Sequence, residues 1–267
     1  NIPFPPTKTA ESREKRGGSR MTTARKKILI LNGSPHRDKS TTLLATNAFA
    51  EGMMRAGDFE TETVHVCALD IKPCMGCLSC WGRTEGECVI RGDDIPALKE
   101  KILAADVVIA SFPLYYFEMP GQMKVMMDRL LSMVKAYHGQ TVPTDGSPAH
   151  EFRYTDSPKK LVIVSGCAYT ETDVVYDPLL RQLDLVFGKN AYTPILLSQF
   201  KTMADNGGQR TQRQLNRIGL AGEEFGANGF LSEKTRREAE KPPFSREVYK
   251  AILENVWQKE REKGGRT

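Results

Sequence analysis

The chain has 267 residues, of which 40% are hydrophobic and 27% charged, enough for one α/β domain with a hydrophobic core plus extensions. No apolar run approaches the roughly 20 residues of a membrane-spanning helix, so we expect no membrane protein. The net charge of +5 comes from the first 27 residues, which carry eight Lys or Arg against two Glu and leave the remainder at −1. We therefore expect no nucleic-acid surface on the fold.

The first 25 residues are proline-rich at their start and then polar, with a paired Gly17-Gly18. They lack the apolar centre of a signal peptide, and we predict a disordered or arm-like basic tail over residues 1–25. With no leader expected, the six cysteines are predicted to stay reduced, which favours a cytoplasmic location over a disulfide framework.

The first buried strand is predicted at Lys27–Leu31, and a helix is predicted to begin at Thr42. The loop between them places hydroxyl side chains at a helix N-terminus, where free N–H groups and the helix dipole favour an anion. Its candidate anion ligands are Ser34, His36, Ser40, Thr41 and Thr42. Neither a Walker A sequence nor G-x-G-x-x-G is present, so a single terminal phosphate is favoured over a triphosphate or a pyrophosphate. Alternatively, these residues only cap the helix.

Four of the six cysteines lie between a second predicted strand, Glu62–Val66, and a helix that begins near Asp93. This cysteine block consists of Cys74, Cys77, Cys80 and Cys88. Closely spaced thiolates of this kind can surround an iron–sulfur cubane. The alternatives are thiols without metal, or structural zinc, which usually has its Cys pairs further apart. Cys67 and Cys167 are expected to be small buried residues.

A third buried strand is predicted at Asp106–Ala110, followed by an aromatic loop and then a helix over Gly121–Tyr137. The candidate binding residues of this loop are Pro113, Leu114, Tyr115, Tyr116 and Phe117. In doubly wound sheets ligands bind beyond the carboxyl ends of the strands. This loop and the loop that carries Ser34 to Thr42, which we call the hydroxyl loop, would therefore face the same crevice. Its aromatic side chains could lie beside a planar ring, or could simply pack in the core.

The next connection, 138–158, is longer than usual and suggests a functional flap. A fourth strand is predicted at Lys160–Ser165, which brings Gly166 to the ligand edge. A helix at Leu179–Phe187 and a fifth strand at Ala191–Leu197 follow. This alternation predicts an α/β fold with a doubly wound, five-stranded parallel sheet.

Beyond residue 200 the pattern changes to two amphipathic helices, Gln209–Phe225 and one marked by Val248–Trp257. Their apolar faces must pack on the parent sheet or on another subunit of a homodimer or homotetramer. We therefore expect a ligand-binding domain over 26–200 and a helical C-terminal extension over 201–267.

The motifs of the first 130 residues resemble those of the flavodoxin-like NAD(P)H-dependent FMN reductases, and most closely the iron–sulfur flavoproteins among them. The matching segments are Gly33-Ser34-Pro35-His36 with Ser40-Thr41, then Pro113 to Phe117, then Gln122-Met123-Lys124 and Met127-Asp128-Arg129. The resemblance covers about residues 26–200. Family members commonly carry Arg, Gly and Asn where this chain has His36, Lys39 and Ser40.

This resemblance implies a flavodoxin-like fold that binds FMN and takes electrons from NAD(P)H. The implied acceptors are small molecules such as quinones, nitro- or azo-aromatics, or free flavin. The cysteine block resembles the compact motif that holds a [4Fe-4S] cluster in the iron–sulfur flavoproteins, which would make a ferredoxin-like protein an electron donor. A third alternative is a non-catalytic flavodoxin-like binding or sensor protein. Because a flavin supplies its own redox chemistry, no side chain is nominated as a catalytic acid or base.

Overall fold

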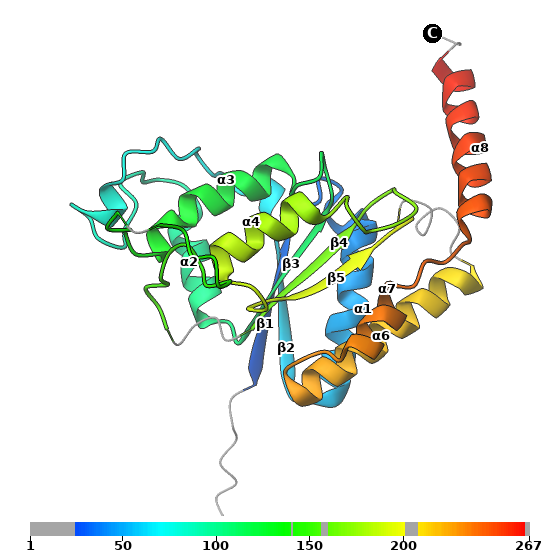
Figure 1. Cartoon of the computed structure of the whole chain (residues 1–267), viewed down its shortest axis with the longest axis horizontal. Helices are drawn as coiled ribbons and strands as arrows, with labels where there is room; N and C mark the ends of the chain where they lie inside the picture. The colour runs from blue at the N-terminus through cyan, green and yellow to red at the C-terminus, as the bar shows by residue number, and fades with distance from the viewer. Residues whose placement is uncertain (1–24, 140, 156–159, 201–207, 265–267) are drawn as a thin grey trace, which may run out of the picture.

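The structure is a computed structural model that describes residues 25–139, 141–155, 160–200 and 208–264. Apart from its last residue, the predicted basic tail lies outside these ranges. A five-stranded sheet forms the centre of the molecule (Figure 1), and all its neighbouring strands are parallel, in the order β2-β1-β3-β4-β5. The strands are β1 (Lys26–Asn32), β2 (Phe59–His65), β3 (Val107–Pro113), β4 (Lys160–Gly166) and β5 (Thr193–Leu197). The predicted flavodoxin-like, doubly wound parallel sheet is therefore confirmed.

Two strand boundaries differ from the sequence predictions. Strand β2 begins at Phe59, three residues before the predicted start, because it pairs with β1 from Lys26 onward. It lies at an edge of the sheet, and its polar, mostly exposed residues hide the strand signal. Strand β3 continues to Pro113 instead of ending at Ala110, because residues 111–113 stay paired with β4.

One face of the sheet is covered by α1 (Thr41–Ala56) and α6 (Gln209–Asn228) (Figure 1). The two helices approach so closely that their backbones touch. A Cβ atom built on Gly222 would lie 1.9 Å from the carbonyl oxygen of Phe49, and one on Gly52 would lie 2.0 Å from that of Gly219. Only glycine fits at these positions. The first C-terminal amphipathic helix thus packs on the parent fold, one of the two arrangements considered from sequence.

The other face is covered by α2 (Ile95–Ala104), α3 (Gly121–Arg129) and α4 (Asp177–Phe187) (Figure 1). Helix α3 ends eight residues before the predicted end and passes into a 3-10 turn, η4 (Leu130–Met133). The chain leaves the helix here because Val134 forms an antiparallel bridge with Phe152.

The connection after η4 folds back on this same face. Its backbone donates hydrogen bonds from Lys135 to Glu151 (2.8 Å) and from Ala149 to Leu185 of α4 (2.7 Å). Residues 140 and 156–158 lie outside the described ranges. The functional flap expected over 138–158 stays a prediction.

The extension also contains α7 (Glu233–Glu240), which the sequence analysis missed, and α8 (Arg246–Gly264). Helix α7 buries only Ala239, so its sequence carries almost no apolar pattern that would predict a helix. The Ser232 cap stabilises its start. Helix α8 projects away from the body (Figure 1). It is held near its start by Tyr249, which is buried and donates a hydrogen bond to the Ala168 carbonyl (2.7 Å). Among the described residues, no helix is long and apolar enough to cross a membrane.

Candidate flavin and cysteine sites

The hydroxyl loop follows β1 and is held by a chain of side-chain hydrogen bonds. The Asn32 carboxamide oxygen accepts from the Ser34 backbone (3.1 Å), and its nitrogen contacts the Arg37 carbonyl (3.2 Å) and a ring nitrogen of His65 (3.0 Å). The other ring nitrogen of His65 contacts Asp38 (3.0 Å). Sequence reasoning missed Asn32, His65 and Asp38 as supports of this loop, because His65 comes from the neighbouring strand.

The five candidate anion ligands of this loop differ in their contacts and in their burial. Ser40 is the N-cap of α1, and its Oγ accepts a hydrogen bond from the Leu43 backbone (3.2 Å). The first helical bond runs from Leu44 to Ser40, so the N–H groups of Thr41 and Thr42 belong to the free first turn. Ser34 and Thr42 are buried, and His36 is exposed. The capping alternative is correct for Ser40, and the free first turn is also present.

The aromatic loop after β3 is a tight two-residue turn. Tyr115 and Glu118 exchange both backbone hydrogen bonds, at 2.8 and 2.9 Å, around Tyr116 and Phe117. Both central residues have positive φ, 49° and 64°, a conformation that bulky side chains rarely adopt. The Tyr116 side chain is 99% exposed. Strain combined with exposed aromatic surface is characteristic of a ligand or partner site rather than of core packing.

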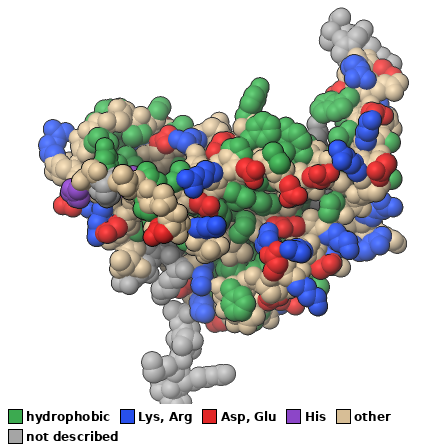
Figure 2. Space-filling view, in the orientation of Figure 1, with side chains coloured by type: hydrophobic (Ala, Val, Ile, Leu, Met, Phe, Trp, Pro, Cys, Tyr) green, Lys and Arg blue, Asp and Glu red, His purple; other side chains and the backbone are tan. Residues whose placement is uncertain are grey.

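The loop after β4 adds a further aromatic side chain at this edge, that of Tyr169. Tyr169 stacks on Phe117, with ring centroids 5.8 Å apart and the planes 25° from parallel. Hydrophobic side chains gather over this end of the sheet in Figure 2. Gly166, predicted at this edge, is buried against Phe200, whose ring leaves no room for a Cβ atom. Pro113 and Leu114 are half-buried at the end of β3. The strand order brings these loops to one edge, as predicted.

The cysteine block forms a loop between β2 and α2, beside the end of α3. All four of its cysteines line one small hollow of about 20 Å³. Cys74 and Cys77 are exposed, while Cys80 and Cys88 are half-buried. Hydrogen bonds from the backbone and hydroxyl of Ser79 lower the pKa of Cys77. Burial raises the pKa of Cys80, and the other three thiols raise it further by charge repulsion.

No group of three or more His, Cys, Asp or Glu side chains in the described ranges is arranged to hold a metal ion. Of the remaining two cysteines, Cys167 is buried as expected. Cys67 is only half-buried, which differs from the prediction, and its thiol donates a hydrogen bond to the Ser34 carbonyl (3.3 Å) at the hydroxyl loop.

A buried ion pair anchors the cysteine loop to α3. The side chains of Arg129 and Asp93 are both 0% exposed and bind one another directly. Arg129 also donates to the Lys72 carbonyl (2.7 Å) and lies within hydrogen-bonding reach of the Cys88 thiol. Burial alone would raise the pKa of Asp93, but hydrogen bonds from Arg129 and from two backbone N–H groups hold it below its ordinary value. The sequence analysis named Asp93 at a helix start and Arg129 in a family motif, but it did not predict that they bind one another.

The geometry of the sheet edge agrees with a comparison of the sequence to known families. Residues 26–160, just over half of the chain, match the family model of the NADPH-dependent FMN reductases. The chain belongs to this family. The resemblance inferred from its motifs is thereby confirmed.

Individual relatives of this FMN reductase family member share shorter stretches. An iron–sulfur flavoprotein of Methanocaldococcus jannaschii is 36% identical over 106 residues, which are 39% of this chain and 51% of the relative. The chain thus spans about half the length of the curated relatives that it matches. Among solved structures, an NAD(P)H:quinone oxidoreductase from Methanothermobacter marburgensis has a TM-score of 0.54 at 18% identity, over 78% of this chain and all of that one. An FMN-dependent NADH-azoreductase from Bacillus anthracis, in complex with FMN, has a TM-score of 0.51 at 17% identity, over 76% of this chain and all of that one. These two structures establish a shared fold.

Proposed function

We propose that the protein is an FMN-containing oxidoreductase that uses NAD(P)H to reduce a small-molecule acceptor, such as a quinone, a nitro- or azo-aromatic compound, or free flavin. One observation supports this above all. The free first turn of α1 and the stacked pair of Phe117 and Tyr169 lie at the same edge of adjacent strands. That edge is where ligands bind in open α/β sheets.

The residues at this edge fit an FMN molecule in their chemistry. The N–H groups of Thr41 and Thr42, with the buried hydroxyls of Ser34 and Thr42, would hold the single phosphate. Phe117 and Tyr169 would pack beside the flavin ring and exclude water from it. When bound, FMN accepts hydride from a nicotinamide and passes electrons on singly or in pairs. The azoreductase of the same fold is bound to FMN, which supports the choice of cofactor.

The experiment has two parts. Flavin released by denaturing the purified protein is identified by chromatography, and oxidation of NADH and NADPH is followed with a soluble quinone. We expect FMN and quinone-dependent turnover. A double change of Ser34→Glu and Thr41→Glu should abolish FMN retention by charge repulsion, while the same change at the exposed Thr61 and Thr63 of β2 should leave it intact.

Three outcomes would contradict parts of this proposal. Release of FAD would show that the loop does not select a single phosphate. Full retention of FMN by the double variant would place the phosphate elsewhere. Bound FMN without turnover on either nicotinamide would support the non-catalytic binding or sensor alternative.

A second candidate function is supported by the cysteine block. In this second function the protein would relay single electrons from a ferredoxin-like partner to FMN. The electrons would pass through a [4Fe-4S] cluster held by Cys74, Cys77, Cys80 and Cys88. The Nε atom of Arg129 is buried beside this hollow and has no hydrogen-bond partner among the described residues. A guanidinium N–H without an acceptor, next to four cysteines, fits an anionic cluster whose sulfurs accept hydrogen bonds. A hollow of about 20 Å³ is smaller than a cubane, so the exposed thiols of Cys74 and Cys77 would have to move outward.

Iron and sulfide analysis of protein prepared without oxygen tests this second function. We expect both elements in the unchanged protein, their loss in Cys80→Ser, and their retention in the control Cys67→Ser, with FMN bound in all three. Protein that binds neither element after anaerobic reconstitution would contradict the cluster. Bound zinc in place of iron would identify a structural zinc site instead.

The division into a flavin-binding domain, 26–200, and a helical extension, 201–267, is part of the same proposal, as are a homodimeric or homotetrameric assembly and a cytoplasmic location. Helix α8 supports an assembly role, because it projects from the body (Figure 1) and its Trp257 side chain is 47% exposed. Light scattering coupled to size-exclusion chromatography would give the mass in solution. A monomer at micromolar concentration would contradict the assembly.

A further inference from the structure

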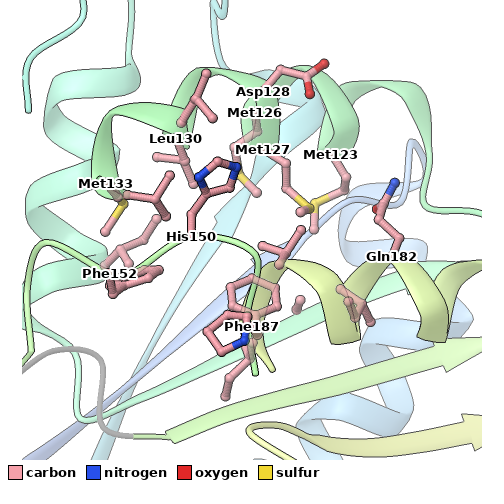
Figure 3. Close-up of a pocket in the computed structure, with 18 of the residues that line it drawn as sticks. Met123, Met126, Met127, Asp128, Leu130, Met133, His150, Phe152, Gln182 and Phe187 are labelled. Atoms are coloured by element: carbon pink, nitrogen blue, oxygen red, sulfur yellow. The ribbon is translucent and has the colours of Figure 1, made fainter. Parts of the chain in front are cut away.

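A cavity of about 820 Å³ lies between α3 and α4, on the sheet face opposite α1 and α6 (Figure 3). Its floor is formed by side chains of β1, β3 and β4. Its other walls come from the connection that follows η4, from Ile102 of α2, and from Cys74 and Gly76 of the cysteine loop. The volume is in the range of small-molecule sites, which is about 300–1,000 Å³. A hollow of this size in a hydrophobic face costs stability unless something fills it.

The cavity wall is adaptable and mostly apolar. Five methionines contribute to it, and the unbranched thioether side chain adjusts to ligands of different shape. They are Met119, Met123, Met126, Met127 and Met133. Two charged residues reach the cavity, Lys124 and Asp128, but they form an ion pair with one another (2.6 Å). The wall therefore offers no net charge, which favours a neutral ligand.

Two buried polar atoms of this wall have no hydrogen-bond partner among the described residues. They are Nδ1 of His150 and Oε1 of Gln182. His150 comes from the connection after η4 and Gln182 from α4, and the two side chains lie apart from one another (Figure 3). Buried polar atoms are nearly always paired, so each of these atoms points to a missing partner. The carboxamide oxygen of Gln182 can only accept, and its partner must be a donor such as a hydroxyl.

We propose that this cavity is a second small-molecule site, which binds a neutral hydroxylated aromatic compound of two or three rings. The rings fill the apolar volume, the hydroxyl donates to Gln182, and a second polar atom of a larger ligand meets His150. The site is separate from the flavin edge. Met123 forms the partition, because its side chain packs against Gly33 at the start of the hydroxyl loop, where a Cβ atom would lie 2.2 Å from its Cγ. The proposal does not depend on FMN binding.

A tryptophan beside the cavity can report on its occupancy. The Trp81 ring contacts His150, with centroids 5.0 Å apart. The chain has two tryptophans, so a full-length Trp257→Phe protein keeps Trp81 as the single fluorophore of its kind. The probes are 4-phenylphenol and biphenyl, which differ only in the hydroxyl. We expect 4-phenylphenol to change Trp81 emission and to bind about fivefold more tightly than biphenyl, since one hydrogen bond is worth about 1 kcal/mol.

Matched variants locate the probe. Gln182→Met keeps the size of the side chain and removes the acceptor, so it should weaken 4-phenylphenol binding about fivefold and leave biphenyl unchanged. Gln212→Met, an exposed position on α6, is the control and should change neither. Ala149→Phe fills the cavity and should weaken both probes, with circular dichroism used to check that the variant is folded.

Several results would overturn the proposal. One is the absence of both an emission change and a calorimetric signal for both probes up to their solubility limits. Another is binding that neither Gln182→Met nor Ala149→Phe weakens. Competition between 4-phenylphenol and added FMN would place the probe at the flavin edge and would also contradict the second site.

Discussion

The two faces of the sheet are closed in different ways. On one face α1 and α6 meet backbone to backbone through Gly52 and Gly222, and the core beneath them is continuous. On the other face α3 and α4 stand apart around a cavity of about 820 Å³, and a buried pair, Arg129 and Asp93, fixes the end of α3. The close packing of α1 and α6 gives rigid support to the hydroxyl loop, which leads directly into α1. The second face leaves room for ligands and for the cysteine loop.

The largest expected effect is at the ion pair of the open face. Asp93→Asn leaves the Arg129 guanidinium buried without a counter-charge, which should reduce the free energy of unfolding by about 3–5 kcal/mol. Because the pKa of Asp93 is lowered in the folded state, its contribution is present above the ordinary Asp pKa of about 4 and is lost as pH falls below that value. Urea unfolding at pH 7 and at lower pH checks both points. A difference between the two proteins that stayed constant with pH would contradict the role of the carboxylate charge.

The closed face should be the more sensitive to added volume. Gly222→Ala places a methyl group 1.9 Å from the Phe49 carbonyl oxygen and should cost roughly 3 kcal/mol, because two helix backbones must separate. Gly121→Ala on α3 is the control. Nothing lies within 4 Å of its Cβ position, and the change should be neutral or slightly stabilising. Similar thermal unfolding midpoints for the two variants would show that α1 and α6 can separate at no cost.

Removing volume sharpens the same comparison. Ile218→Ala, on the buried face of α6, should cost about 3 kcal/mol, while Leu183→Ala, at the cavity wall, should cost about 2 kcal/mol. Both side chains are fully buried, but Leu183 already borders empty space and loses fewer contacts. Guanidinium unfolding of both variants measures the difference. Equal costs would mean that the cavity face is packed as well as the other.

The smallest expected effect is at the cap of α1. Ser40→Ala should reduce stability by about 1 kcal/mol, because the Leu43 N–H loses its acceptor. Ser232→Ala removes the equivalent cap of α7 and should cost about the same. If the hydroxyl loop holds the flavin phosphate, only the first change should also weaken FMN retention in equilibrium dialysis. Equal retention by both would separate the cap of α1 from cofactor binding.

Parts of the site could be predicted because they follow from local sequence. A buried strand followed by hydroxyl residues and a helix places Ser34 and Thr42 beside the free first turn of that helix whatever the rest of the chain does. The strained turn at Tyr116 and Phe117 could not be predicted from composition, because neither residue is a usual turn former. The supports of the hydroxyl loop were missed for another reason: His65 is distant in sequence and reaches Asn32 only through the pairing of β1 and β2.

The sequence by itself determined the alternation of strands and helices, the parallel sheet and the family, since hydrophobic periodicity and short motifs are local properties. The tertiary structure decided which segments meet. It paired Arg129 with Asp93, brought Tyr169 onto Phe117, shortened α3 at the bridge from Val134, and left the cavity between α3 and α4. Such features depend on which segments, distant from one another in the sequence, come into contact. They arise from packing and from the pairing of buried polar groups, which no single segment contains.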